Sequence, residues 1–136
     1  MAEIISKHTG NMSFSTQLDG HEIIMDSDVD FGGKDLGPRP KPLLLIALAG
    51  CTGMDVVSLL NKMRVEFSDF EIKVSGDLTD EHPKYYRKIH VTYYICTEEK
   101  YYSKVEKAVA LSQERYCGVS YMLSKAADLS HEIIYL

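Results

Sequence analysis

The segment from Leu43 to Leu60, LLLIALAGCTGMDVVSLL, is the most apolar part of the chain. Its length approaches that of a membrane span, but it contains Asp55 and two glycines, and basic residues lie close to both ends. A transmembrane helix usually needs about 20 nearly uniform apolar residues. We therefore expect no membrane association and interpret the segment as a long buried helix from about Pro42 to Val65, because proline suits a first helical turn.

This predicted helix is apolar on nearly every face up to Leu60, so it must be covered on all sides in the folded state. The chain has 136 residues, which is the size of one domain. We therefore expect a single domain over residues 1–136. So short a chain has few other elements with which to surround the helix. We predict a homodimer, in which a second copy supplies part of the cover.

The segments on both sides of this helix show strand patterns. Asp19-Gly20 is a hairpin-turn signal, and Ile72 and Val74 alternate with polar residues, as in a half-buried strand. We expect strands over residues 12–18, 21–26, 70–77, 86–97 and 132–136, and two further helices over 103–115 and 119–127. Strands joined by hairpins rather than by regular βαβ units indicate an α+β fold with antiparallel sheets.

Charge and cysteine content exclude several classes of protein. The net charge of −5 disfavours a nucleic-acid-binding protein, which would carry a basic surface. Three cysteines are too few for a disulfide scaffold. Residues 1–11 do not form a signal peptide, so we expect a cytoplasmic location, where thiols stay reduced. The five histidines lack the spacing of a zinc site, and we expect neither a metal nor an organic cofactor.

Two of the three cysteines stand in unusual places. Cys51 lies inside the apolar helix between two glycines, which implies close backbone packing or access to the sulfur. Asp55 lies four residues later, on the same helical face, and its charge would raise the pKa of the thiol. Cys117 precedes a predicted helix, where the helix dipole favours a thiolate. We interpret Cys96, at the end of a strand, as structural. Taken singly, the other two are also compatible with simple core packing.

Two motifs resemble a known family. The stretches LLLIALAGCTGMDVVSLLNKMR (Leu43–Arg64) and LSQERYCGVSYML (Leu111–Leu123) are similar to the cysteine motifs of the OsmC/Ohr family of hydroperoxide-detoxifying proteins, in its broader OsmC-like branch. The segments FSTQLDGHEIIMD, GPRPKP, EHPKYYRKIHVTY and KVEKAVALSQERYC follow the order of the family, so the resemblance covers most of the chain.

The resemblance implies an intertwined homodimer, in which sheets of both subunits wrap two central helices. It also implies that Cys51 is the peroxidatic cysteine and Cys117 the resolving one. The thiolate of Cys51 would reduce a hydroperoxide and become a sulfenic acid, Cys117 would convert it to a disulfide, and an external thiol or dithiol would reduce the disulfide. This chemistry needs no metal or organic cofactor and serves oxidative-stress defence.

The chain departs from the family at the groups that activate the thiolate. Family members place an N-terminal arginine against it and a glutamate near the start of the central helix, but this chain has no arginine before Arg39 and reads Pro40-Lys41-Pro42 at the helix start. Arg39, Lys41 or His21 are the candidates for the missing cation. Along a straight helix, Arg39 and Lys41 lie about 15–18 Å from Cys51, so they could act only through a fold-back or from a partner chain.

Three alternatives remain open. The chain could be a non-catalytic dimer that binds a small apolar or thiol-reactive ligand, a slow redox sensor, or a hydrolase that pairs Cys51 or Cys117 with His82 or His90. Candidate pocket residues are Leu48, Met54 and Met122. The chain also contains three tyrosine pairs, and each should place one ring inward. The inward rings would contribute to core packing or form an apolar rim around the thiol. The pairs are Tyr85-Tyr86, Tyr93-Tyr94 and Tyr101-Tyr102.

Overall fold

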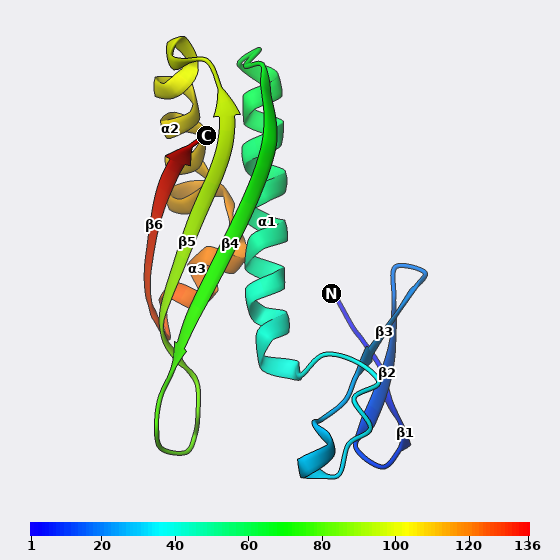
Figure 1. Cartoon of the computed structure of the whole chain (residues 1–136). Coiled ribbons are helices and arrows are strands. Elements are labelled where there is room, and N and C mark those ends of the chain that lie inside the picture. The colour runs from blue at the N-terminus through cyan, green and yellow to red at the C-terminus, as the bar shows by residue number, and fades with distance from the viewer. The chain divides into compact units, whose positions relative to one another are not determined.

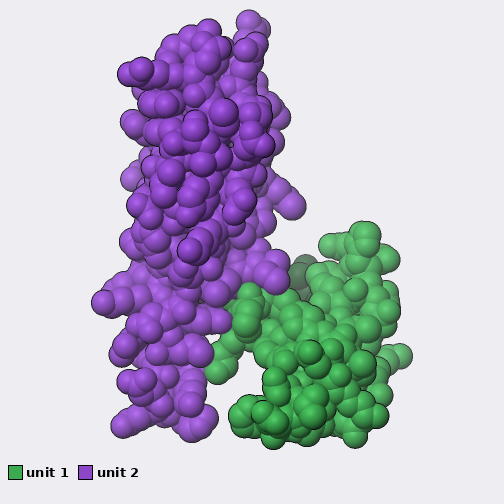
Figure 2. Space-filling model, in the orientation of Figure 1, with its two compact units in different colours: residues 1–44 green, residues 45–136 purple.

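The computed structural model describes all residues from 1 to 136 as two compact units, residues 1–44 and residues 45–136 (Figure 2). Each unit contains one three-stranded sheet, and all α-helical packing lies in the second unit. The predicted α+β class is therefore confirmed.

The first unit is a β-meander followed by an ordered loop. Strands β1 (Ser6–Gly10), β2 (Ser13–Leu18) and β3 (His21–Met25) pair antiparallel in that order. The predicted hairpin at Asp19-Gly20 is confirmed, and both turn residues have a positive φ, of 52° and 80°. The sequence analysis did not predict β1, because its residues show no apolar alternation and all five are exposed.

The buried carboxylate of Asp26 organises the loop after β3, which includes a short 3-10 turn, η1 (Val29–Phe31). It accepts hydrogen bonds from the backbone N–H groups of Ser27, Lys34 and Leu36, at 2.8, 3.1 and 3.1 Å. Burial by itself raises the pKa of Asp26, but the three N–H donors together lower it below its usual value. The ionised carboxylate therefore stabilises the loop conformation.

The second unit packs three helices on one mixed sheet of order β4-β5-β6, in which the strands are β4 (Phe67–Leu78), β5 (Tyr86–Thr97) and β6 (Asp128–Tyr135) (Figure 1). The helices are α1 (Pro40–Lys62, of which residues from 45 on belong to this unit), α2 (Tyr102–Leu111) and α3 (Gly118–Ser124). A 3-10 turn, η2 (Glu99–Tyr101), precedes α2, and a π-helical turn, η3 (Ser112–Tyr116), joins α2 to α3.

The prediction of purely antiparallel sheets is wrong for this unit. β4 and β5 form an antiparallel hairpin as expected, but β6 pairs parallel to β5. The segment that connects β5 to β6 contains α2, η3 and α3. It returns to the end of the sheet where β5 starts, and so forms the crossover that parallel pairing requires. The last strand is also longer than predicted, because it begins at Asp128 rather than at residue 132.

The core lies between the sheet and the helices. Every second residue of β5 faces the helices and is at most 2% exposed. These residues are Ile89, Val91, Tyr93 and Ile95. The helix α1 contributes a stripe with a spacing of four residues, Leu48, Thr52, Val56 and Leu60.

Within the single chain, α1 is not covered on every face. Ile46 is 61% exposed and Met54 is 77% exposed. α1 is long and apolar enough to cross a membrane. The core helix of a folded domain can meet the same two criteria of length and composition. A helix with apolar residues on an uncovered face needs a further surface against which to pack.

Candidate functional site

Two cysteines and one carboxylate, contributed by α1 and by the start of α3, lie close together in the second unit. The ligand atoms of Cys51, Asp55 and Cys117 all lie within 4.8 Å of one another. Cys51 and Asp55 lie one turn apart on α1, as their spacing of four predicts, and Cys117 lies at the start of α3. The structure therefore brings together three of the site residues that the sequence suggested. Cys96 lies in β5 and does not belong to this group.

The backbone around Cys117 holds its side chain in place. Cys117 caps α3 with an extended backbone, and its sulfur accepts a hydrogen bond from the N–H of Ser120 at 3.3 Å. Its own N–H donates to the carbonyl oxygen of Ser112 at 2.8 Å, across the π-helical turn. The sequence analysis predicted the helix start at this point but not the turn before it. Cys117 is only 3% exposed.

A network of buried hydroxyl groups links α1, β5 and the π-helical turn that precedes Cys117. The hydroxyl of Thr52 lies 2.6 Å from that of Tyr93 and 2.8 Å from that of Ser112. Ser112 also hydrogen-bonds to a carboxylate oxygen of Asp55 at 3.1 Å, and the amide of Gln113 donates to Tyr93.

The sequence analysis missed this network. It interpreted Tyr93 as packing or as a rim, whereas the ring is fully buried and its hydroxyl is hydrogen-bonded. Tyr93 and Tyr94 do alternate between the faces of β5, as predicted. The signal that could have revealed the network is the polar residue Thr52 inside the most apolar helix of the chain.

The electrostatic environment keeps Cys51 protonated. Burial raises the pKa of the Cys51 thiol, the hydrogen bond with Cys117 raises it further, and the charge of Asp55 acts in the same direction. The backbone N–H of Val119 acts against these effects and lowers the pKa of Cys51. The thiolate of Cys51 therefore needs a nearby positive charge.

The candidate cations differ in their availability. Arg39 forms ion pairs with Asp35 at 2.6 Å and with Asp28 at 3.3 Å, inside its own unit. The hydrogen bond with Asp35 is the main reason that the pKa of Arg39 is raised. Lys41 forms none of the ion pairs in the structure, and neither does Asp55.

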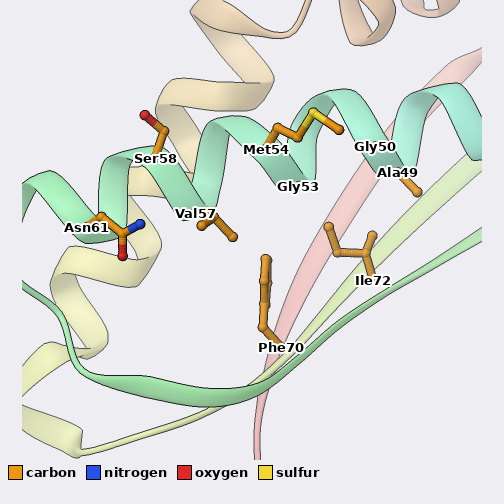
Figure 3. A pocket seen from close by; sticks show the side chains of 9 residues that line it. All are labelled: Ala49, Gly50, Gly53, Met54, Val57, Ser58, Asn61, Phe70 and Ile72. Atoms are coloured by element: carbon orange, nitrogen blue, oxygen red, sulfur yellow. The ribbon is translucent and has the colours of Figure 1, made fainter. Parts of the chain in front are cut away.

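The candidate pocket residues lie in different surroundings. Leu48 is fully buried in the core, whereas Met122 is 64% exposed on α3. Met54 lines an open, mainly apolar groove of about 680 Å³ between α1 and β4, in which Phe70 and Ile72 point toward the helix (Figure 3). The three residues therefore do not line this groove together.

The glycines that flank Cys51 face the same groove. A Cβ atom on Gly53 would lie 2.9 Å from the Cδ1 atom of Ile72, so glycine at this position permits close packing of β4 on α1. A Cβ atom on Gly50 would meet nothing within 4 Å. Of the two reasons that the sequence suggested, close backbone packing applies at Gly53.

A second cleft, of about 560 Å³, opens on Cys117. Arg115, Tyr121, His131 and Ser120 are among the residues that line it. The hydroxyl group of Ser120 is buried and has no hydrogen-bond partner. A buried hydroxyl without a hydrogen-bond partner costs free energy. A polar ligand in the cleft next to Cys117 would lie near this hydroxyl.

Of the two histidines of the hydrolase hypothesis, His82 is exposed in the loop between β4 and β5, and His90 lies on the other face of the sheet. His90 alternates with the core residues Ile89 and Val91, and its ring contacts Ser130 at 2.7 Å and Glu132 at 3.0 Å. A general base must reach the proton that it removes. The orientation of His90 therefore gives no support to a hydrolase built on it.

Comparisons with known proteins agree with this architecture. The family described as OsmC-like protein matches residues 32–132. The chain belongs to the OsmC-like family. Protein YhfA of Escherichia coli K12 is 35% identical over 112 residues, which cover 82% of this chain and 81% of YhfA.

Solved structures of OsmC-like proteins share the fold over nearly the whole chain. A hypothetical protein from Aquifex aeolicus has 30% identity and a TM-score of 0.81, and the match covers 100% of this chain and 98% of that one. The organic hydroperoxide resistance protein OsmC from Legionella pneumophila has 18% identity and a TM-score of 0.67, with coverage of 98% and 97%. At that identity the likeness shows the fold alone.

Proposed function

We propose that this OsmC-like protein reduces hydroperoxides through a pair of cysteines, with Cys51 as the peroxidatic and Cys117 as the resolving residue. The observation that carries the proposal is the approach of the two thiol sulfurs to within 4.8 Å, although they come from different elements. A disulfide would bring the two sulfurs from this separation to about 2.05 Å. The family includes the Legionella protein, which is described as an organic hydroperoxide resistance protein.

The proposed reaction has three steps. The thiolate of Cys51 attacks the terminal oxygen of ROOH, the O–O bond breaks, and the alkoxide leaves as ROH after taking up a proton. Cys117 then attacks the sulfenic sulfur of Cys51, which forms the disulfide and releases water. Two external thiols reduce the disulfide and are themselves joined, so the sum is ROOH plus two thiols giving ROH, water and a disulfide.

The cleft beside Cys117 is the proposed entry site for the reducing thiol. Its lining includes Cys117 but not Cys51, so the incoming thiolate would attack the sulfur of Cys117. The leaving group would then be the thiolate of Cys51, which is the form required for the next cycle. Ser120, whose buried hydroxyl has no hydrogen-bond partner, is among the residues that line this cleft.

We also propose a homodimer as the active form, with no membrane or nucleic acid as partner and a cytoplasmic location. The exposed apolar residues of α1, such as Ile46 and Met54, support this proposal, because a second copy of the chain would bury them. The partner would also bring its own cations. Lys41, which forms no ion pair within the chain, is better placed to supply a charge than Arg39, which two carboxylates already bind.

A non-catalytic binding protein is the second candidate, and the raised pKa of Cys51 favours it. The apolar groove of about 680 Å³ between α1 and β4 would then receive a small apolar ligand. A slow redox sensor would form the same disulfide without rapid turnover.

Peroxide consumption separates the three cases. With cumene hydroperoxide and a dithiol in excess, the peroxidase should turn over many times per chain, and Cys51→Ser should abolish the turnover. The sensor should consume about one equivalent in a first phase and then turn over only slowly. A parent protein that consumes no peroxide would refute both and leave the binding function. Cys96→Ser serves as the matched control and should behave like the parent protein.

A further inference from the structure

We infer that the reduced protein binds a divalent cation of the zinc type through Cys51, Asp55 and Cys117. Their two sulfur atoms and one carboxylate oxygen lie within 4.8 Å of one another. Tetrahedral Zn²⁺, with bonds of about 2.3 Å to sulfur and about 2.0 Å to oxygen, holds such ligand atoms about 3.5–3.8 Å apart. Each pair of ligand atoms therefore needs to approach by at most about 1.3 Å. The spacing of the residues did not indicate a site, because Cys117 is distant from the other two in the sequence.

The chemistry of the three groups also suits this class of ion. Two thiolates with one carboxylate are ligands that zinc accepts, whereas magnesium and calcium prefer oxygen alone. Three protein ligands leave a fourth position of the tetrahedron for water or an external thiol. Binding displaces the two thiol protons to solvent and leaves the ion bound to two thiolates and one carboxylate.

Two of the three ligands are already oriented by a neighbouring donor. The N–H of Ser120 donates to the sulfur of Cys117, and the hydroxyl of Ser112 hydrogen-bonds to Asp55. Such second-sphere donors fix the ligands of metal sites and partly offset their negative charge.

The cluster also lacks a positive charge of its own. None of the five ion pairs in the chain involves Asp55. A carboxylate next to two thiols, with no cation beside it, is a costly arrangement at low solvent exposure. A bound divalent ion supplies the missing charge and holds both sulfurs away from oxidation.

Metal binding and disulfide formation therefore exclude each other. In the oxidised chain both sulfurs belong to one disulfide and neither can act as a thiolate ligand. The cation would thus control the redox chemistry of the pair. This inference does not depend on peroxidase turnover, because the same ligands would bind the ion in a chain that reacts with no peroxide.

Cobalt titration of the full, reduced chain under anaerobic conditions tests the site. We expect one Co²⁺ per chain, with the visible absorption of tetrahedral cobalt and a sulfur-to-metal charge-transfer band, and displacement by Zn²⁺, which binds more tightly. Cys51→Ser and Cys117→Ser should each weaken binding at least tenfold. Asp55→Asn should weaken it as well, and Cys96→Ser should bind like the parent.

Three results would overturn the inference. These are unchanged cobalt bands in the variant that lacks both Cys51 and Cys117, equal binding by the chain after oxidation to the disulfide, and no bands in a reduced parent that is shown to be folded by circular dichroism. Peroxide consumption by metal-free protein is measured in parallel. Turnover without cobalt binding refutes the metal site alone, whereas cobalt binding without turnover refutes the peroxidase alone.

Discussion

The hydroxyl groups of Thr52 and Tyr93 lie 2.6 Å apart in the interior of the second unit, next to the position of Cys51 in α1. This hydrogen bond connects the central helix to the central strand at the level of the two thiols. It is part of the network that continues through Ser112 to Asp55. The position of Asp55 relative to the thiols therefore depends on a buried polar contact as well as on apolar packing.

Removing the Tyr93 hydroxyl should destabilise the fold. Tyr93→Phe removes the acceptor of the Gln113 amide and one of the two hydroxyl partners of Thr52, which keeps Ser112, and a buried polar group left unsatisfied costs about 1–3 kcal/mol. The free energy of unfolding in urea should fall by that amount. Tyr94→Phe, at the next position of the same strand and only half-buried, is the control and should change stability by less than about 0.5 kcal/mol. Equal effects of the two variants would contradict the role of the network.

Neutralising Asp55 should make Cys51 more reactive. The charge of Asp55 raises the pKa of the Cys51 thiol, so Asp55→Asn should lower that pKa and increase the thiolate fraction near neutral pH. The rate of alkylation of Cys51 by iodoacetamide, measured against pH, should rise and its midpoint should shift to lower pH. Alkylation of Cys96 in the same samples should stay constant. A midpoint for Cys51 that moves upward would contradict this electrostatic account.

A charge on the exposed face of α1 should disrupt the proposed dimer. Ile46→Glu places a carboxylate at an apolar position that is 61% exposed in the single chain and would be desolvated under a second copy. Light scattering should show the mass of one chain for this variant and of two for the parent. Ile134→Glu introduces the same change on the edge strand β6, where Ile134 is 37% exposed, and should leave the dimer intact. A parent protein with the mass of one chain would contradict the proposal.

The loop of the first unit should be sensitive to acid through Asp26. Its pKa is lowered in the folded chain from the ordinary value of 3.8, so the unfolded chain binds more protons between the two values. The stability from the ionised carboxylate is present above about pH 4 and is lost as the pH falls through the folded pKa.

The Asp26→Asn variant should therefore be less stable than the parent protein at pH 7. Its stability should also fall less steeply than that of the parent as the pH drops below 4. Amide hydrogen exchange of Lys34 and Leu36, which donate to Asp26, is the measurement. Asp30→Asn, at an exposed position in the same loop, is the control. Unchanged protection in Asp26→Asn at pH 7 would show that the carboxylate does not hold the loop.

The sequence predicted the features that depend on local pattern. The apolar segment gave α1 to within three residues, since the helix runs over Pro40–Lys62, and Asp19-Gly20 gave the hairpin of β2 and β3. The two cysteine motifs pointed to Cys51 and Cys117, which the fold brings together. Asp55 followed from its spacing on the helix.

The sequence could not predict the features that depend on tertiary pairing. The parallel alignment of β6 with β5 depends on where the crossover ends, and strand patterns carry no direction. Tyr93 carries the same β-strand signal whether its hydroxyl is exposed or bonded to Thr52. The π-helical turn before Cys117 interrupts a segment that is amphipathic throughout, so the pattern predicted a continuous helix to residue 115.

The most direct test of the central claim is non-reducing mass spectrometry of the fully reduced protein after a slight excess of cumene hydroperoxide. We predict a loss of about two hydrogens per chain and a peptide pair that joins Cys51 to Cys117, with Cys96 still free. In Cys117→Ser, dimedone should label Cys51 as a sulfenic acid. Unchanged thiols at Cys51 and Cys117, in protein that is folded and dimeric, would contradict the two-cysteine mechanism.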